Sequence, residues 1–278
     1  MAGAVGDAEQ SVTYADRSGD AFQRMSKRTT HADALHQAGR RAEAETRFRE
    51  AERMQAERQP DYPLLYSLQG FRYGDLLLAA SEHAAWQTIC SGSRRPPEDI
   101  VAHTATLQGI SQRATQTLKW AMNGGLGLLT LALDHLTLGR AALYAMILEG
   151  GDDAFETARH ELDAAVSGLR HSGNMDDLPR GLLTRAWLRF LEGKCTGPDS
   201  AQADLDEAWE IAERGPMRLF LADIHLHRAR LFFRETTYPW ESPAADLAAA
   251  RKLIEQCGYG RRKEELEDAE AIIRQQSS

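Results

Sequence analysis

The stretch Ala158-Arg-His-Glu-Leu162-Asp-Ala-Ala165 decides the fold, because its pattern recurs along the chain. An alanine is followed four positions later by a large apolar residue, and three positions after that by a second alanine. These offsets place the three side chains on one face of an α-helix. Two small residues let a neighbouring helix approach closely, and the large residue fills the gap between them. The pattern therefore predicts a helix that packs against a second helix through this face.

Further copies of the pattern extend over most of the chain. They are Ala8–Val12–Ala15, Ala44–Phe48–Ala51, Ala114–Leu118–Ala121, Ala201–Leu205–Ala208 and a degraded copy, Pro243–Leu247–Ala250. The copies lie about 40 residues apart, with one step of about 70, which suits repeats of two helices joined by loops. We expect the first helix of each pair over residues 24–38, 63–80, 126–148, 179–191 and 216–234. The sequence therefore predicts an all-α protein with one domain over residues 1–278.

Proline and glycine placement supports these boundaries independently. Pro63, Pro179, Pro216 and Pro243 fall at proposed helix starts, where a missing N–H is harmless. The other prolines fall in proposed loops, and glycines follow several proposed helices, where a left-handed cap is favourable. The repeat pattern and the helix-end signals therefore predict the same set of helices.

The repeats resemble the tetratricopeptide (TPR) superfamily over nearly the whole chain. Within the first helix expected over residues 63–80, Tyr66, Gly70 and Tyr73 match the TPR pattern of an aromatic residue, a small residue and a tyrosine. A TPR unit is a pair of antiparallel helices, and successive units stack. The resemblance implies a right-handed superhelical solenoid that acts as a scaffold for protein binding.

A narrower resemblance is to TPR arrays of large bacterial multidomain signalling proteins of the STAND type. It is carried by residues 57–70, 114–120, 178–183 and 254–262. In such proteins the array is a sensor or scaffold that follows a nucleotide-driven switch. The run Asn123-Gly-Gly-Leu-Gly127 lacks the lysine of a phosphate-binding loop. The resemblance therefore implies binding of a partner and no enzymatic activity or cofactor.

Two irregularities interrupt the array. The loop composition of Ser91-Gly-Ser-Arg-Arg-Pro-Pro97 predicts a long loop insertion near residues 81–102, with a short helix around residues 83–89. A polar helix near residues 261–275 is expected to cap the C-terminal end, whereas the N-terminal helix has no such cap. We therefore expect either a longer array or self-association through the uncapped N-terminal end.

The composition of the chain bears on the kind of partner that it binds and on its location in the cell. The net charge is −8 and the charges are interspersed, so no clustered basic face for nucleic acid is expected. The most apolar window, residues 126–148, is broken by Asp134, His135 and Arg140, which favours a buried helix over a membrane span. Three widely spaced cysteines suit a reduced protein, so we expect a cytoplasmic location without a membrane partner.

In TPR arrays the first helices line a concave groove, and the resemblance assigns that role to residues one, four and five places after each small crossing residue. The groove would combine aromatic side chains with arginine, which suits an extended protein or peptide partner that carries acidic and apolar side chains. The candidate partner-binding residues are Phe71, Asp75, Arg140, Tyr144, Trp187, Phe190, Arg230 and Arg234.

Chemical alternatives find little support in the residue spacing. His225 and His227 point to different faces of a helix, so no metal pair is expected. Asp134 and His135 also diverge, and Cys195 has no histidine nearby in sequence. Three hypotheses remain open. The protein is an interaction scaffold, a self-assembling structural repeat protein, or a helical enzyme that uses Asp134, His135 or Cys195.

Overall fold

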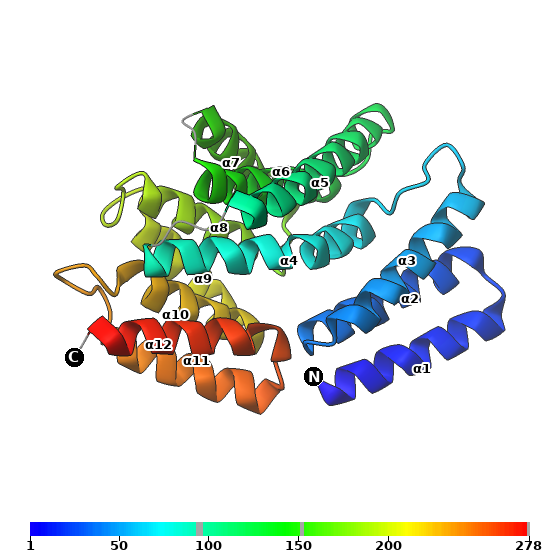
Figure 1. Cartoon of the computed structure of the whole chain (residues 1–278). Coiled ribbons are helices and arrows are strands. Elements are labelled where there is room, and N and C mark those ends of the chain that lie inside the picture. The colour runs from blue at the N-terminus through cyan, green and yellow to red at the C-terminus, as the bar shows by residue number, and fades with distance from the viewer. Residues whose placement is uncertain (93–96, 151–152, 277–278) are drawn as a thin grey trace.

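The structure is a computed structural model that describes residues 1–92, 97–150 and 153–276 (Figure 1). Over these residues the chain forms helices and no strand, which confirms the prediction of an all-α protein. The helices are α1 (Ala2–Ser18), α2 (Ala21–Gln37), α3 (Arg41–Arg58), α4 (Ser67–Ser91), α5 (Pro97–Asn123), α6 (Leu128–Glu149), α7 (Asp153–Ser172), α8 (Leu178–Leu191), α9 (Ala201–Arg214), α10 (Arg218–Phe232), α11 (Pro243–Cys257), the 3-10 turn η1 (Gly260–Arg262) and α12 (Lys263–Gln276).

Helices that follow one another in sequence pack against one another, as Figure 1 shows. The expected pairs are all present: α2 with α3, α4 with α5, α6 with α7, α8 with α9, and α10 with α11. α1 packs on α2, and α12 packs on α11. The pairing of first and second helices that the sequence pattern predicts is therefore found in the structure.

The recurring alanines are buried where the paired helices meet. Ala44, Phe48 and Ala51 of α3 have no exposed surface, and Ala158, Leu162 and Ala165 of α7 have none either. Gly139 of α6 is one of the small residues expected at a helix crossing. A Cβ atom added to it would lie 2.7 Å from Cγ and Cδ2 of Leu162. The large residue of the second helix therefore fills the space that the small residue of the first helix leaves open.

Side-chain caps fix several helix starts. The Asp20 carboxylate accepts the backbone N–H of Gln23 at 2.7 Å at the start of α2. The Ser200 and Ser242 hydroxyls accept the corresponding N–H groups of α9 and α11. Pro243 follows its cap directly in the first turn of α11, where proline is tolerated. The predicted starts at Pro179 and Pro243 are confirmed, because both prolines lie in the first turn of their helices. The predicted starts at Pro63 and Pro216 are wrong, because α4 begins at Ser67 and α10 at Arg218.

The long loop expected near residues 81–102 is wrong for most of that range. α4 continues to Ser91, and α5 begins at Pro97. Residues 93–96 lie outside the described part of the chain. α4 continues because Ala84, Ala85 and Trp86 have an apolar face to bury, and all three are buried in the main core. Ser91 and Pro97 are helical, and Gly92 is the one described residue between α4 and α5. The rest of the predicted loop lies outside the described residues.

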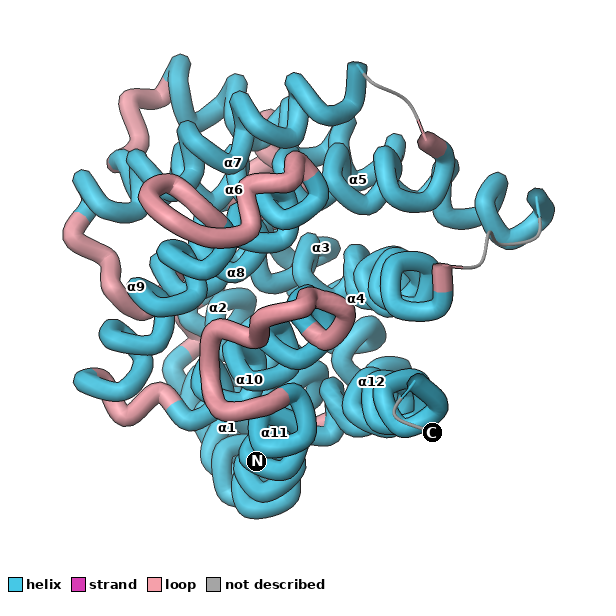
Figure 2. The backbone as a smooth tube through the Cα atoms, turned by 90° about the vertical axis from the view of Figure 1, so that its left-hand side faces the viewer, coloured by secondary structure: helices cyan, strands magenta, loops and turns pink. Residues whose placement is uncertain are grey.

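Elements near the C-terminal end of the chain pack against the first four helices. In Figures 1 and 2, α12 lies beside α4, and η1 contacts α2. The N-terminal ammonium group donates a hydrogen bond to the carbonyl oxygen of Cys257 at the end of α11. A helix does occupy the region of the expected C-terminal cap, but Glu265, Leu266 and Ala269 of α12 are buried. α12 is therefore an internal packing element as well as the end of the helix array.

α6 is the helix of the described chain that is long and apolar enough to cross a membrane. Within the protein, 67% of its apolar window is buried, as expected for a core helix that packs on α4, α5 and α7. Asp134 and Arg140 on α6 are themselves buried and paired with other side chains.

Candidate partner-binding site

The predicted groove residues do lie on first helices, but most of them are not exposed. Six are buried: Phe71 and Asp75 on α4, Arg140 and Tyr144 on α6, Trp187 on α8, and Arg230 on α10. Phe190 is half-buried against Phe232, with ring centroids 5.1 Å apart. Arg234 is exposed and donates to the carbonyl oxygen of Cys90 at 2.7 Å.

An open groove lined by these side chains is therefore the wrong description. Trp187 and Arg230 are only 1% and 2% exposed. Trp187 is covered by the rings of Trp86, Tyr144 and His227. Arg230 is covered by Glu265, which belongs to the chain's own residues 259–276. We call this stretch, which contains η1 and α12, the C-terminal segment.

The wall that faces the C-terminal segment is built mainly from two first helices. Asp75, Glu82 and Trp86 come from α4, and Asp223 and Arg230 come from α10. We call these five residues the receptor face. Asp75 and Glu82 are two turns apart on α4, so they lie on one side of that helix.

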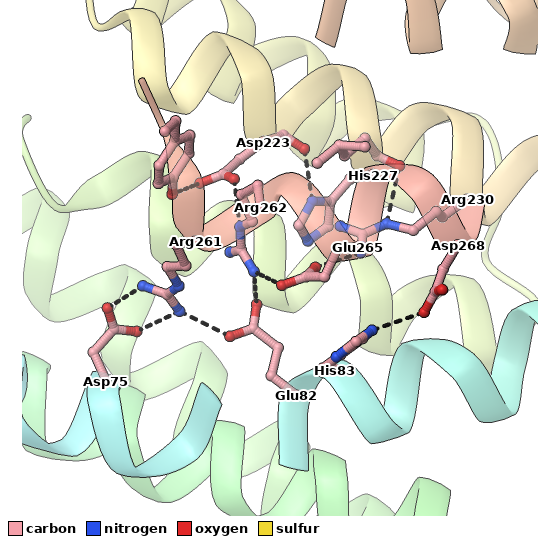
Figure 3. A network of polar contacts seen from close by, with 12 residues as sticks. Asp75, Glu82, His83, Asp223, His227, Arg230, Arg261, Arg262, Glu265 and Asp268 are labelled. Atoms are coloured by element: carbon pink, nitrogen blue, oxygen red, sulfur yellow. Dashed lines mark hydrogen bonds and ion pairs between the residues drawn. The ribbon is translucent and has the colours of Figure 1, made fainter. Parts of the chain in front are cut away.

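Two consecutive arginines of the C-terminal segment reach into the receptor face (Figure 3). Arg261 donates to both carboxylate oxygens of Asp75 and to Glu82 Oε2, the latter at 3.0 Å. Arg262 donates to Asp223 Oδ1 at 2.8 Å and pairs with Glu82 Oε1 at 2.9 Å. Two carboxylates of α4 therefore hold Arg261, and one carboxylate each from α4 and α10 holds Arg262.

The contacts continue along the first turns of α12. Glu265 accepts a hydrogen bond from Arg230 Nη1 at 2.6 Å, and it also pairs with Arg262. Asp268 lies 2.8 Å from His83 Nε2 on α4 (Figure 3). Carboxylates of the receptor face therefore hold the two arginines of the segment, and Arg230 of the receptor face holds the glutamate that follows them.

Aromatic rings close the inner side of the receptor face. The guanidinium carbon of Arg230 lies 3.9 Å from the ring centroid of Trp86. The opposite side of that indole stacks on Trp187, with centroids 3.5 Å apart and planes inclined by 15°. Such a cation–π contact fixes the position of a guanidinium group away from water. Arg230 is therefore presented to Glu265 in one orientation.

Arg140 and Arg180, which lie outside the C-terminal segment, also form ion pairs with the receptor face. Arg140 Nη1 is 2.8 Å from Asp75 Oδ1, and its Nη2 donates to Glu82 at 3.0 Å. Arg180 Nη1 is 2.9 Å from Asp75 Oδ2. A buried carboxylate is stable only when it is paired in this way.

The surroundings keep the network charged. Burial would raise the pKa of Asp75, but Arg180, Arg261 and Arg140 outweigh it and hold that pKa well below its usual range. Burial acts in the same direction on Glu82, and the neighbouring guanidinium groups again hold the pKa well below its usual value. Both carboxylates are therefore ionised at neutral pH, and the network does not titrate there.

Two histidines in these surroundings are neutral at pH 7. Burial, reinforced by Arg261, lowers the pKa of His36 well below its ordinary value. Burial, reinforced by Arg230, lowers the pKa of His227 to about 3. Nε2 of His36 is buried without a hydrogen-bond partner and lies 3.8 Å from Asp75 Oδ2.

A cleft of about 410 Å³ opens beside the network, between α2, the start of α3, α4, α5, η1 and α12. Its lining includes His36, Arg41, His83, Arg261 and Glu264. Arg41 and Glu264 are exposed at the rim. The cleft gives solvent and any partner access to one edge of the contact between the receptor face and the C-terminal segment.

Sequence reasoning missed the residues that organise this site: Glu82, Asp223, Arg261, Arg262 and Glu265. The polar helix expected near residues 261–275 was taken as a solvated cap, yet Arg262 of η1 and Glu265 of α12 are buried. A usable signal was present on α4. Asp75 and Glu82 lie on the same helical face as buried Leu78, and buried charges require charged partners.

The residues of the chemical alternatives have separate partners. His225 lies beside Asp246, and His135 Nδ1 lies 2.6 Å from Glu161 Oε2. Asp134 accepts a hydrogen bond from Thr117 at 2.8 Å. Among the described residues, no three His, Cys, Asp or Glu side chains are placed to hold a metal ion.

No protein-family model matches the chain, and neither a curated protein nor a solved structure shows significant similarity to it. The relationship to TPR proteins rests on the repeat pattern, and it stays a prediction.

Proposed function

We propose that this chain is a TPR-like solenoid that binds a protein or peptide partner at the receptor face, as a scaffold or sensor module. One observation carries the proposal. The receptor face already holds a peptide segment, the chain's own residues 259–276, through a set of charge pairs that depends on the order of side chains in that segment.

The architecture supports the same function. Helix pairs that cross at small residues, such as Gly139 against Leu162, are typical of arrays whose first helices present a continuous surface. Here the first helices α4, α6, α8 and α10 supply the side chains that converge on the network. The proposal therefore assigns partner binding to the first helices, because side chains of α4 and α10 also hold the chain's own residues 259–276.

Affinity capture from the host lysate tests the function. The bait is the full chain, compared with a variant that reverses two exposed charges at the cleft rim, Arg41→Glu with Glu264→Lys. A matched control reverses two exposed charges elsewhere, Lys252→Glu with Glu213→Lys. Because all four side chains are exposed, we expect these variants to fold like the unmodified chain.

The proposal predicts a partner that the unmodified chain and the matched control capture, and that the rim variant loses. The captured protein is then purified and titrated into each chain by calorimetry, where a saturable isotherm that the rim reversal weakens supports the function. Equal capture by all three baits, or no saturable binding, would overturn it. Light scattering over a range of concentrations separates this function from self-assembly, which alone predicts growth with concentration.

A further inference from the structure

We infer that the C-terminal segment is an intramolecular ligand of the receptor face, and that the partner is a helical segment with the same charge order. This inference rests on the proposed function and names the chemistry of its partner. The pattern read from the bound segment is glycine, two arginines, two variable residues and a glutamate, as in Gly260-Arg261-Arg262-Lys263-Glu264-Glu265.

The two arginines are selected by the acidic side of the receptor face. Asp75, Glu82 and Asp223 are buried carboxylates, and each is contacted by Arg261 or Arg262. A segment without cations at these two positions would leave the carboxylates with too few partners in a site that excludes water. A basic segment is therefore favoured over an acidic one.

The glutamate is selected by the opposite charge at the other end of the face. Arg230 is fixed by its stack on Trp86 and donates to Glu265. Arg262 and Glu265 are one helical turn apart and also pair with each other. The segment must therefore be helical for both charges to reach their partners.

The glycine is required because two backbones touch. A Cβ atom on Gly260 would lie 2.3 Å from the carbonyl oxygen of Ala38, at the end of α2. That atom belongs to the backbone and cannot move aside as a flexible side chain would. The residue before the arginine pair is therefore limited to glycine.

A limited set of apolar side chains holds the C-terminal segment. Tyr259, Leu266 and Ala269 are buried in a cluster with α10 and α11. Ile273 is partly buried beside them, and Ile272 packs on the main core. Lys263 and Glu267 face solvent. Buried ion pairs contribute little net stability, because the cost of removing the charges from water offsets their attraction. The charges therefore decide which segment fits, whereas a few apolar side chains decide how tightly it is held.

The link before the segment suits a detachable element. α11 ends at Cys257, and Gly258 has φ +63°, the left-handed conformation that ends a helix. The Tyr259 N–H donates to the Ile254 carbonyl oxygen and so belongs to this cap, which stays in place if the segment detaches after Tyr259. The segment would then compete with a partner at the high effective concentration of a tethered ligand.

The test uses a synthetic peptide with the sequence of residues 258–276, labelled with fluorescein and titrated into the full chain by anisotropy. The second receptor is the full chain with Arg261→Ala and Arg262→Ala, whose own segment is weakened. We expect this variant to bind the peptide at least 10-fold more tightly than the unmodified chain does, because less competition opposes binding. A peptide with both arginines replaced by glutamate should show no saturable binding.

Two controls keep the test decisive. If the double alanine variant loses its cooperative thermal transition, the receptor becomes the chain with Arg261→Lys and Arg262→Lys, which keeps both charges but loses the bidentate geometry. In parallel, excess unlabelled peptide added to the unmodified chain should speed hydrogen exchange in α12 and leave exchange in α6 unchanged.

Equal binding of the native and charge-reversed peptides would overturn the inference, as would the absence of any exchange effect on α12. These results differ from a failure of the proposed function. A host partner whose capture depends on the cleft rim would preserve the function even when the peptide does not bind.

Discussion

Glu82 offers the sharpest single perturbation of the receptor face. It is 4% exposed and holds Arg140 and Arg261 at 3.0 Å and Arg262 at 2.9 Å. Glu82→Gln keeps the size of the side chain and removes its charge, so three buried guanidinium groups lose a counter-charge. Breaking one partner out of a buried ion network costs about 3–5 kcal/mol.

The geometry places the expected loss at the low end of that range. Arg261 and Arg262 can leave with the C-terminal segment and regain hydration, whereas Arg140 on α6 stays buried. We therefore expect a loss of about 3 kcal/mol in the free energy of unfolding. At about 2 °C per kcal/mol for a chain of this length, the midpoint of thermal unfolding should fall by about 6 °C.

Urea unfolding followed by circular dichroism measures the loss. The matched control is Glu210→Gln, which removes an exposed glutamate that pairs with Arg214 at 2.9 Å within α9. An exposed pair of this kind contributes at most about 1 kcal/mol, and usually less. A loss below about 1 kcal/mol for Glu82→Gln, equal to that of the control, would refute the assignment of Glu82 to a buried charge network.

Three further changes test other parts of the structure. Gly139→Ala should lower the free energy of unfolding in urea by about 1–3 kcal/mol, because its Cβ would lie 2.7 Å from Leu162. When Gly139→Ala is combined with Leu162→Ala, the loss should be smaller than the sum of the losses of the two single variants. Burial raises the pKa of Asp134 to about 7, so the folded state loses stability as pH rises from about 4 to about 7. Asp134→Asn should therefore match the unmodified chain at pH 4 and exceed it by about 4 kcal/mol at pH 8, and an equal difference at both pH values would contradict the burial of this carboxylate. Gly260→Ala should speed hydrogen exchange in α12 by about tenfold or more, because its Cβ meets the Ala38 carbonyl oxygen; unchanged exchange would contradict that close approach.

The helix pairs were predictable because the information that specifies them is local. In Ala44–Phe48–Ala51 and Ala158–Leu162–Ala165, one short pattern encodes both the helix and its packing face, and both sets are buried as expected. The loop near residues 81–102 was misjudged because composition at residues 91–97 was extended backward over α4. There the apolar face of Ala84, Ala85 and Trp86 decides the structure.

The site could be predicted only in part, because its key contacts are distant in sequence. Asp75, Arg140 and Arg230 were placed correctly on first helices, and they do belong to one network. Asp75 is paired with Arg261 and Arg230 with Glu265, and the sequence around both partners is typical of a solvated polar helix. No local pattern distinguishes an arginine that faces water from one that meets a buried carboxylate across the fold.

Hydrogen exchange of the full chain, resolved by segment, tests most directly that residues 259–276 are held at the receptor face as a separable ligand. The account predicts that α12 exchanges through a local opening, at a lower free energy than α6, and that Glu82→Gln speeds exchange in α12 by about 100-fold, the equivalent of about 3 kcal/mol. Exchange in α12 and α6 through one shared opening, in both the unmodified chain and the variant, would contradict it.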